Sequence, residues 1–287
     1  MKIGIVGNGF VGSSVAFGFS PQCGCDGADV KIYDKDESKS THSLEEVLLS
    51  EFIFLSVPTP SKPDGSVSLK IVYDIFDEIN ETNTRPDNII LLRSTVTPGT
   101  TRKLQIGFHN LNIVFNPEFL TEAKSFDDFK NQSRIIIGGN PAIDCHGAKK
   151  VKQMFRKPFP DIPIIVTKWE TAEMVKYFTN CFLATKVTFA NQMYEICEAA
   201  RVDYDKVCEY ALYDERIGKT HLAVPGPDGD RGFGGHCFPK DLAAMIYYAW
   251  ETVDADRGFL EAIECMNEHY RTNKDWEKMK GRAVSED

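Results

Sequence analysis

The chain lacks several features that would place it in a broad class at once. Its 287 residues contain no run of about 18 apolar residues, and its start does not read as a signal peptide. Basic residues are not in excess, since 33 lysines and arginines stand against 42 acidic residues, for a net charge of −9. Such a balance gives no electrostatic footprint for nucleic acid. We therefore expect neither a membrane nor a nucleic-acid partner.

Closely spaced cysteines are also scarce. The eight cysteines are scattered, at positions 23, 25, 145, 181, 197, 208, 237 and 265. Only Cys23 and Cys25 lie close together, and one such pair without further ligands is weak evidence for zinc. This usage predicts no metal site. It indicates reduced thiols and a cytoplasmic location.

A glycine-rich turn near the N-terminus is the first feature that points to a ligand. A strand-like run over residues 2–6 leads directly into Gly7-Asn-Gly-Phe-Val-Gly12. In such a turn the first glycine permits a tight bend, the second lets the backbone approach a pyrophosphate, and the third lets the following helix pack closely. Asp34 ends the next strand-like run, where a carboxylate can bind a ribose 2′-hydroxyl. The pattern predicts NAD bound by Gly7, Gly9, Phe10, Val11, Gly12 and Asp34.

Strand-like and helical patterns alternate over about the first 165 residues. Further strand-like runs cover residues 52–57, 88–93, 112–115, 134–137 and 162–166, and helical patterns cover 69–79 and 141–155. Alternation of this kind predicts a doubly wound parallel sheet. We expect an α/β fold, with an N-terminal Rossmann-type domain at residues 1–167 and an all-helical domain at residues 168–287. Three loops, 56–60, 93–99 and 116–122, follow strands, where such sheets bind ligands.

A second glycine-rich segment carries the strongest sign of chemistry. Residues 232–241 read Gly-Phe-Gly-Gly-His-Cys-Phe-Pro-Lys-Asp. A thiol attacks as the thiolate, and Lys240 with a helix N-terminus would lower the pKa of Cys237 from about 8.5 toward neutrality. The alternative is a buried cysteine in a tight turn, because free cysteine packs as a small apolar residue. Asp241 is expected to cap the helix that follows it.

A long helix is predicted for residues 167–200, which contain no proline or glycine. Lys176 and Asn180 are four residues apart and share a face, so an ammonium and an amide can act on one ligand, although such a pair is often only a hydrated surface. Shorter helices are expected at 203–213, after Asp241, and from 257 to about 280. The buried side of the long helix is expected to comprise Ala172, Val175, Phe178, Phe182, Thr185 and Phe189.

In their order along the chain, these motifs resemble the UDP-glucose/GDP-mannose dehydrogenase family. Seven segments carry the resemblance: the glycine-rich turn, Val57-Pro-Thr-Pro60, Ser94-Thr-Val-Thr-Pro-Gly99, Asn116-Pro-Glu-Phe-Leu120, Lys176 with Asn180, Arg216-Ile-Gly218, and Gly234-Gly-His-Cys-Phe-Pro-Lys-Asp241. Members of the family oxidise UDP-glucose, GDP-mannose or N-acetylated UDP-sugars. The spellings Val-Pro-Thr-Pro and Cys-Phe-Pro-Lys-Asp favour UDP-glucose.

The resemblance implies a four-electron oxidation at C6 of the sugar, from alcohol through aldehyde to carboxylate, with two NAD⁺ consumed. A cysteine suits the second half of this reaction, because the aldehyde must gain a nucleophile before it can yield a second hydride. Cys237 would supply it, through a thiohemiacetal and then a thioester. With UDP-glucose as substrate, the product would be UDP-glucuronate.

The resemblance also suggests roles for residues around the thiol. Lys176 and Asn180 would stabilise an oxyanion at C6, Asp241 and Glu122 would transfer protons, and Glu118 would lie near the hydrolytic water. The NAD pocket would include Thr59, Thr95, Glu122 and Lys240. The nucleotide sugar would contact Phe119, Leu120, Lys176, Asn180, Phe233 and Gly234, and Arg216 would reach a substrate held by the other subunit of a homodimer formed through the helical domain.

Relatives usually continue into a second Rossmann-like domain that binds UDP, and we expect this chain to lack it. The helical segment between Asp34 and Phe52 is expected to be shortened as well. Two other functions stay open. One is a non-catalytic NAD-binding remnant that assembles with a full-length enzyme. The other is a dehydrogenase of small hydroxy acids, which shares the Lys-x-x-x-Asn helix but makes no use of Cys237.

Overall fold

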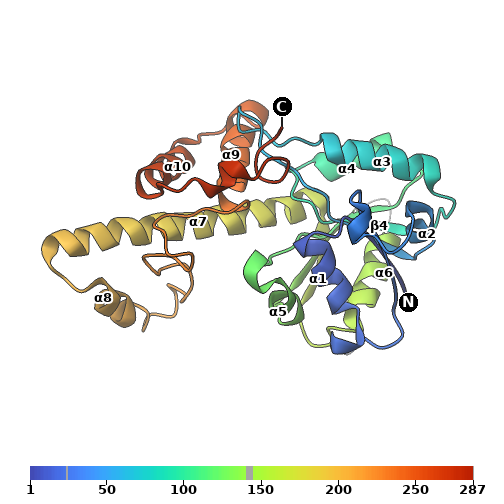
Figure 1. The fold of residues 1–287 in the computed structure, drawn as a ribbon, viewed down its shortest axis with the longest axis horizontal. Coiled ribbons are helices and arrows are strands. Elements are labelled where there is room, and N and C mark those ends of the chain that lie inside the picture. Colours follow the sequence, from blue (N-terminus) through green and yellow to red (C-terminus); the bar gives the residue numbers. More distant parts are fainter. Residues whose placement is uncertain (24, 140–144, 287) are drawn as a thin grey trace. The chain divides into compact units, whose positions relative to one another are not determined.

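The chain forms two compact units in a computed structural model that describes residues 1–23, 25–139 and 145–286 (Figure 1). Unit 1 comprises Met1–Thr59 and Leu69–Lys176, and unit 2 comprises Pro60–Ser68 and Tyr177–Asp287. Residues 60–68 thus leave unit 1 as a loop that belongs to unit 2. The functional domain bounds at residues 167 and 168 stay a prediction. Within the described residues, no helix has both the length and the apolar character needed to cross a bilayer.

Unit 1 is built on a seven-stranded sheet in the order β2-β1-β3-β4-β5-β6-β7. Strands β3 and β4 are buried on both faces, and their near-continuous apolar sequences are typical of parallel strands covered by helices. The predicted strands are confirmed to within a few residues. Their bounds are β1 Lys2–Val6, β2 Asp29–Tyr33, β3 Phe52–Leu55, β4 Ile89–Leu92, β5 Ile113–Phe115, β6 Ile135–Gly139 and β7 Ile164–Lys168.

One pair of strands departs from the predicted parallel arrangement. Strand β5 pairs with β6 in the antiparallel sense, through the single register pair Phe115 and Gly138. The side chain of Asn116 extends this contact, because its amide donates to the Ile136 carbonyl at 2.7 Å. Between β5 and β6, a side-chain hydrogen bond thus supplements a backbone ladder of only one pair. Sequence periodicity does not reveal this arrangement.

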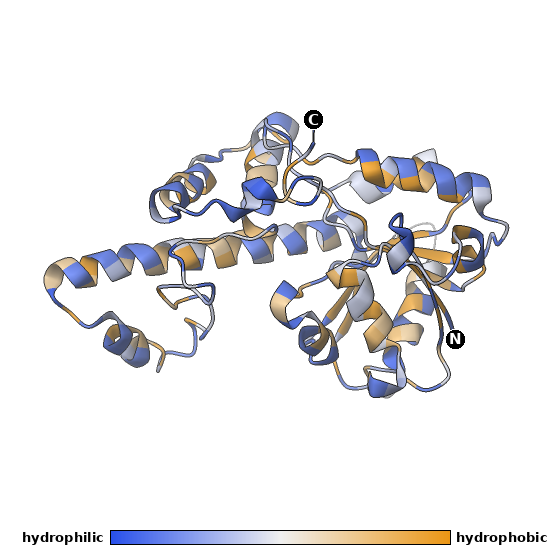
Figure 2. Ribbon diagram, viewed as in Figure 1, coloured by the Kyte–Doolittle hydropathy of each residue, from blue (hydrophilic) through white to orange (hydrophobic). Residues whose placement is uncertain are grey.

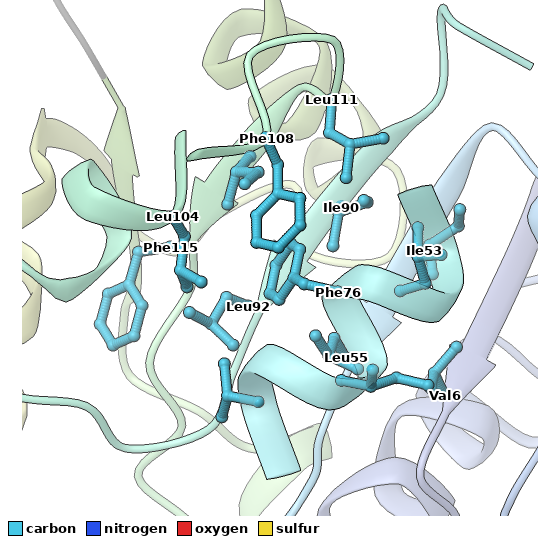
Figure 3. Packing of buried hydrophobic residues seen from close by; sticks show 14 of the residues in the cluster. Val6, Ile53, Leu55, Phe76, Ile90, Leu92, Leu104, Phe108, Leu111 and Phe115 are labelled. Carbon is cyan, nitrogen blue, oxygen red and sulfur yellow. The ribbon is translucent and has the colours of Figure 1, made fainter. Parts of the chain in front are cut away.

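Helices cover both faces of the sheet and form two apolar cores. Helices α2, α3 and α4 pack on one face, where Phe76 and Phe108 stack on each other in one apolar cluster with strand residues such as Leu92 (Figure 3). Helices α1, α5 and α6 pack on the other. The helices of unit 1 are α1 Phe10–Gly18, α2 Leu44–Leu48, α3 Lys70–Thr82, α4 Thr100–Gly107, α5 Ser125–Lys130 and α6 Cys145–Arg156. The predicted start of α6 at Pro141 lies outside the described residues.

Unit 2 is mainly helical, as predicted. Asp203 caps α8 by accepting the Lys206 N–H at 3.1 Å, which fixes the start of that helix. The helices are α7 Trp169–Ala200, whose first turns belong to unit 1, α8 Tyr204–Ala211, α9 Phe238–Tyr247 and α10 Gly258–Tyr270, with short turns at Tyr248–Thr252 and Asp275–Lys278. Residues 280–285 return to the 60–68 loop, since Ser61 donates to Ala283 O and accepts from Ser285 N, both at 2.8 Å.

The predicted buried side of α7 is wrong for its aromatic residues. Ala172 is fully buried, but Phe178, Phe182 and Phe189 are 71%, 56% and 58% exposed. Apolar residues recur along the whole helix (Figure 2), and unit 2 packs against other positions such as Cys181, Ala184 and Val187. Periodicity locates an apolar stripe, but it does not say whether the same chain covers it.

The predicted last helix is also too long. Helix α10 ends at Tyr270, and Arg271 adopts an extended conformation with ψ 101°. Its buried guanidinium binds Asp228 at 2.6 Å and Asp275 at 3.0 Å. These ion pairs draw the chain out of the helix, although the residues that follow are polar and compatible with it.

Candidate active site

The glycine-rich turn of unit 1 has the shape that a dinucleotide requires. Gly7 lies at φ +90°, and a Cβ there would sit 2.4 Å from the Ser56 carbonyl oxygen. A Cβ on Gly12 would sit 2.0 Å from the Gly7 oxygen, whereas Gly9 faces open space at the N-terminus of α1. Phe10 and Val11 form the first turn of that helix. Side chains are thus excluded where helix and strand meet, and a pyrophosphate can approach the backbone at Gly9.

Asp34 stands beside this turn, at the end of β2. Its Oδ2 accepts the Asn8 N–H at 2.6 Å and its Oδ1 accepts the Asp36 N–H at 2.9 Å. The Asn8 Oδ1 is buried without a partner among the described residues. A fixed carboxylate and an unsatisfied amide oxygen at the turn suit the hydroxyl groups of a ribose. These residues fit NAD.

Two of the predicted rim loops are joined by polar contacts. Thr59 donates its hydroxyl to the Thr95 carbonyl oxygen at 2.8 Å. The loop at Gly99 is held by Glu173 of α7, which accepts the Gly99 N–H at 2.6 Å and the Thr101 N–H at 2.8 Å. Burial raises the pKa of Glu173, although these bonds oppose the shift. Glu173 was not predicted from the sequence.

A buried ion pair fixes the proposed oxyanion donor Lys176. Its Nζ lies 2.7 Å from Glu118 Oε1 and 2.9 Å from the Glu118 carbonyl oxygen, with both side chains almost fully buried. Burial would raise the pKa of Glu118, but Lys176, the Leu120 N–H and the nearby Arg93 together hold it below its ordinary value. Glu118 therefore stays a carboxylate.

Aromatic and basic side chains lie beside this pair. Phe119 lies under the Arg134 guanidinium at 4.2 Å from the ring centroid and within 5.8 Å of Lys176 Nζ. Leu120 is half-buried and packs against the core beneath α1. Glu122, by contrast, is exposed at the start of a short 3-10 helix. Among the residues of this loop, the structure thus holds Glu118 and Phe119 close to Lys176.

In unit 2, Asn180 and Asp241 meet in a buried network. The Asn180 amide donates to Asp241 Oδ2 at 2.6 Å, and Lys240 Nζ lies 2.6 Å from Asp241 Oδ1. Asp241 is only 1% exposed. The prediction that it caps a following helix is wrong, because α9 begins earlier, at Phe238. Pro239 suits the first turn of that helix, so Asp241 lies inside the helix rather than before it.

Cys237 occupies the N-cap position of α9 and is half-buried. Its Sγ lies 3.4 Å from His236 Nε2. The N-terminal end of a helix favours an anion, so this position suits a thiolate. Lys240, which the sequence suggested as the cation for this thiol, is bonded to Asp241.

The loop before the thiol is clamped from three sides. Asn191 of α7 accepts the Gly232 N–H at 3.2 Å, and Asn267 of α10 both accepts the Phe233 N–H and donates to its carbonyl oxygen. Asp275 accepts the Gly235 N–H at 3.0 Å. A side chain on Gly234 is excluded, since its Cβ would lie 2.3 Å from the Arg271 guanidinium.

Arg216, the residue predicted to reach a neighbouring subunit, does not join either group. It lies in an exposed loop after α8, where its Nε contacts Asp214 at 2.8 Å. The residues missed by sequence reasoning are Glu173, Asn191, Asn267, Arg271 and Asp275. No sequence pattern pointed to them, because each contacts a partner that lies far away in the sequence.

Two domain models of one family match the chain. Residues 38–157 match the NAD binding domain of the UDP-glucose/GDP-mannose dehydrogenase family, and residues 170–269 match its central domain. The chain belongs to this family. The NAD prediction is confirmed by the match to the family's NAD binding domain.

Relatives in the family include named enzymes. The chain is 30% identical to the UDP-glucose 6-dehydrogenase AglM of Haloferax volcanii, over 86% of this chain and 65% of that protein. It is 32% identical to a UDP-glucose 6-dehydrogenase of Rickettsia conorii, over 85% and 62%. It thus spans less than two thirds of the length of these relatives. A solved UDP-glucose dehydrogenase from Pyrobaculum islandicum has a TM-score of 0.78 at 28% identity, covering 93% of this chain and 68% of that one.

Proposed function

We propose that the chain catalyses the NAD-dependent oxidation of UDP-glucose at C6 to UDP-glucuronate, by way of an aldehyde and a Cys237 thioester. The observation that supports this most is the start of α9. There a half-buried thiol stands at a helix N-terminus, four residues before a carboxylate that is bonded to both Asn180 and Lys240. Such a constellation suits covalent capture of an aldehyde.

Unit 1 supplies most of the residues that we assign to the cofactor. We assign the pyrophosphate to the backbone at Gly9 and the N-terminus of α1, and a ribose to Asp34. Thr59 and Thr95, bonded to each other, line the same rim, and we assign Glu122 and Lys240 to the cofactor as the family suggests. When bound, NAD⁺ accepts a hydride from C6 in each of the two oxidations.

Lys176 and Asn180 are assigned to the oxygen at C6. They are four residues apart on α7, and we assign both to this oxygen as the family resemblance suggests. Glu118 holds the Lys176 ammonium in place, and its own lowered pKa keeps it a carboxylate. A donor that is already oriented in a buried setting stabilises developing negative charge without reorganising.

Cys237 is assigned the covalent step and Asp241 a proton-transfer role. The thiolate adds to the aldehyde carbon to give a thiohemiacetal, which is oxidised to a thioester. Water then attacks the thioester carbon, the C–S bond breaks, and the carboxylate product leaves while the thiol is restored. Along the substrate we place Phe119, Leu120, Phe233 and Gly234, with Glu118 and Glu122 toward the water. Arg216, being exposed, is assigned to substrate in another subunit.

We further propose that two copies pair through α7. Its exposed stripe comprises Phe178, Phe182, Phe189 and Ile196, spaced by four, seven and seven residues, so that all lie on one side of the helix. Covering four large apolar side chains removes considerable surface from water. A homodimer formed through this stripe would also be consistent with the assignment of Arg216 to substrate in the other copy.

The proposed activity is tested by NADH formation from purified protein with NAD⁺ and UDP-glucose, beside GDP-mannose and UDP-N-acetylmannosamine. Two NADH per UDP-glucose support the proposal. Two NADH per molecule of another sugar would keep the reaction and correct the substrate. Silence with all three sugars, together with measurable NAD binding, would favour the non-catalytic remnant.

The covalent mechanism is tested by Cys237→Ser. We expect formation of the acid to fall by at least about a thousandfold, because a hydroxyl is a far weaker nucleophile than a thiolate, while NAD affinity stays the same. Cys265→Ser, at an exposed cysteine of α10, is the matched control. An unchanged rate in Cys237→Ser would remove the thioester mechanism.

A further inference from the structure

His236 stands directly against the sulfur of the candidate nucleophile. Its Nε2 lies 3.4 Å from Cys237 Sγ, within hydrogen-bond range for a sulfur atom, and both side chains are half-buried. An imidazole can accept a proton at neutral pH, where a lysine cannot, because its ordinary pKa lies near 6.5. The two residues are adjacent in sequence, and the glycine-rich loop that carries them is held by Asp275.

We propose that His236 is a catalytic base that activates Cys237. The proton of the Sγ–H bond passes to His236 Nε2, and the sulfur electron pair forms the new C–S bond to the aldehyde carbon. The π electrons of the carbonyl move to its oxygen, which takes the proton back from the imidazolium. Thiol and aldehyde are thus joined as a thiohemiacetal, and His236 returns to its neutral form.

The same imidazole is placed to act again when the thioester is hydrolysed. It takes one proton from the attacking water, the C–S bond breaks, and the departing sulfur recovers that proton. This role rests on the proposed function, since it requires that Cys237 is the nucleophile. It differs from the assignments of Lys176 and Asp241, whose hydrogen bonds described above are to carbonyl, carboxylate, amide and ammonium groups rather than to the sulfur.

Other titratable groups lie in this part of unit 2, among them Cys181 and Lys186 of α7, which interact with Asp241 and His221, respectively. They also include Lys240 and Asp241 in the first turn of α9, Asp275 of the 3-10 helix, Arg271 of α10, Asp228 of the preceding loop, and His221, whose ring contacts Phe238. Each of these carboxylates is bonded to a cation. A titration of Cys237 reactivity therefore tests whether the histidine and the thiol exchange a proton.

The test is the rate of iodoacetamide alkylation of Cys237 against pH, followed by peptide mass spectrometry on the full chain under reducing conditions without NAD. For His236→Gln we expect the rate at pH 7 to fall about tenfold, the effect of a rise of one unit in the thiol pKa. At high pH, where the thiol ionises unaided, the rates should converge. His236→Asn serves as a second variant, and circular dichroism checks that each one folds.

His221→Gln is the matched control, because it removes an exposed imidazole of the same unit that contacts the α9 start through Phe238. Its profile should match that of the unaltered chain. Equal alkylation of His236→Gln and the unaltered chain at pH 7 would overturn the proposal, and so would an equal fall in His221→Gln. The alkylation profile does not depend on turnover, so failure of the proposed function would show separately, as silence in the NADH assay.

Discussion

Glu118, a carboxylate buried beside Lys176 and Arg93, makes unit 1 sensitive to acid. Its pKa is lower in the folded chain than the ordinary value of about 4.3, so its contribution to stability is complete above that value and is lost as pH falls through the folded pKa. Removing one partner of a buried pair costs about 3 kcal/mol or more. We expect Glu118→Gln to lower the free energy of unfolding by about that amount at neutral pH, and by progressively less below about pH 4.

Urea unfolding at a series of pH values measures this difference. Glu81→Gln, at an exposed position of α3, should leave the curve unchanged at every pH. A penalty for Glu118→Gln that is the same at pH 3 and pH 7 would contradict the argument, because the lost interaction would then not depend on an ionised carboxylate.

Single residues were predictable where the backbone imposes their type. Gly7 and Gly12 must lack a side chain, and their spacing in the sequence was enough to locate the turn. The site role of Asp241 stays a prediction, and its predicted position as a helix cap was wrong. A cap and a buried hydrogen-bond acceptor have the same sequence signature, and only the partner, Asn180, distinguishes them. Such partners lie far apart in sequence.

At the scale of elements, the clamp on the loop before Cys237 is a testable unit. Asp275 accepts the Gly235 N–H and binds Arg271. Asp275→Ala therefore removes the hydrogen-bond acceptor of that N–H and one of the carboxylates that bind the buried guanidinium. The expected loss is about 1–3 kcal/mol of unfolding free energy in unit 2, together with slower acid formation. The matched control is Glu277→Ala in the same 3-10 helix, whose exposed carboxylate lies 4.0 Å from Lys274. Equal urea midpoints for the two variants would show that the clamp contributes nothing.

Element positions followed well from periodicity, and element ends did not. Strands β3 and β4 were recognisable as short apolar runs, and the absence of proline and glycine marked α7. The end of α10 was missed by about ten residues. Arg271 leaves the helix to reach Asp228 and Asp275, and ion pairs of this kind override the weak helix preference of the residues beyond it.

At the scale of the whole molecule, the exposed stripe on α7 predicts self-association. Phe182→Glu places a charge in the centre of the stripe, and burying that charge in a dimer would be costly. We expect this variant to sediment as a monomer at concentrations where the unaltered chain is a dimer, with analytical ultracentrifugation as the measurement. Tyr213→Glu, at a residue that is 82% exposed after α8, should leave the dimer intact. A monomeric unaltered chain, or a dimeric Phe182→Glu, would contradict the proposed pairing.

Residues 60–68 are synthesised early, but the segment with which they pair is synthesised late. Ser61 pairs with Ala283 and Ser285, so more than two hundred residues separate the two sides of this contact. During synthesis on the ribosome, residues 1–176 can form the sheet of unit 1 before residues 280–285, which pair with this loop, have been made. Unit 2 becomes whole only after residues 280–285 have emerged, and closing so long a loop is slow. We therefore expect residues 60–68 to be open to proteolysis until residues 280–285 have been made, and protected after the two segments pair.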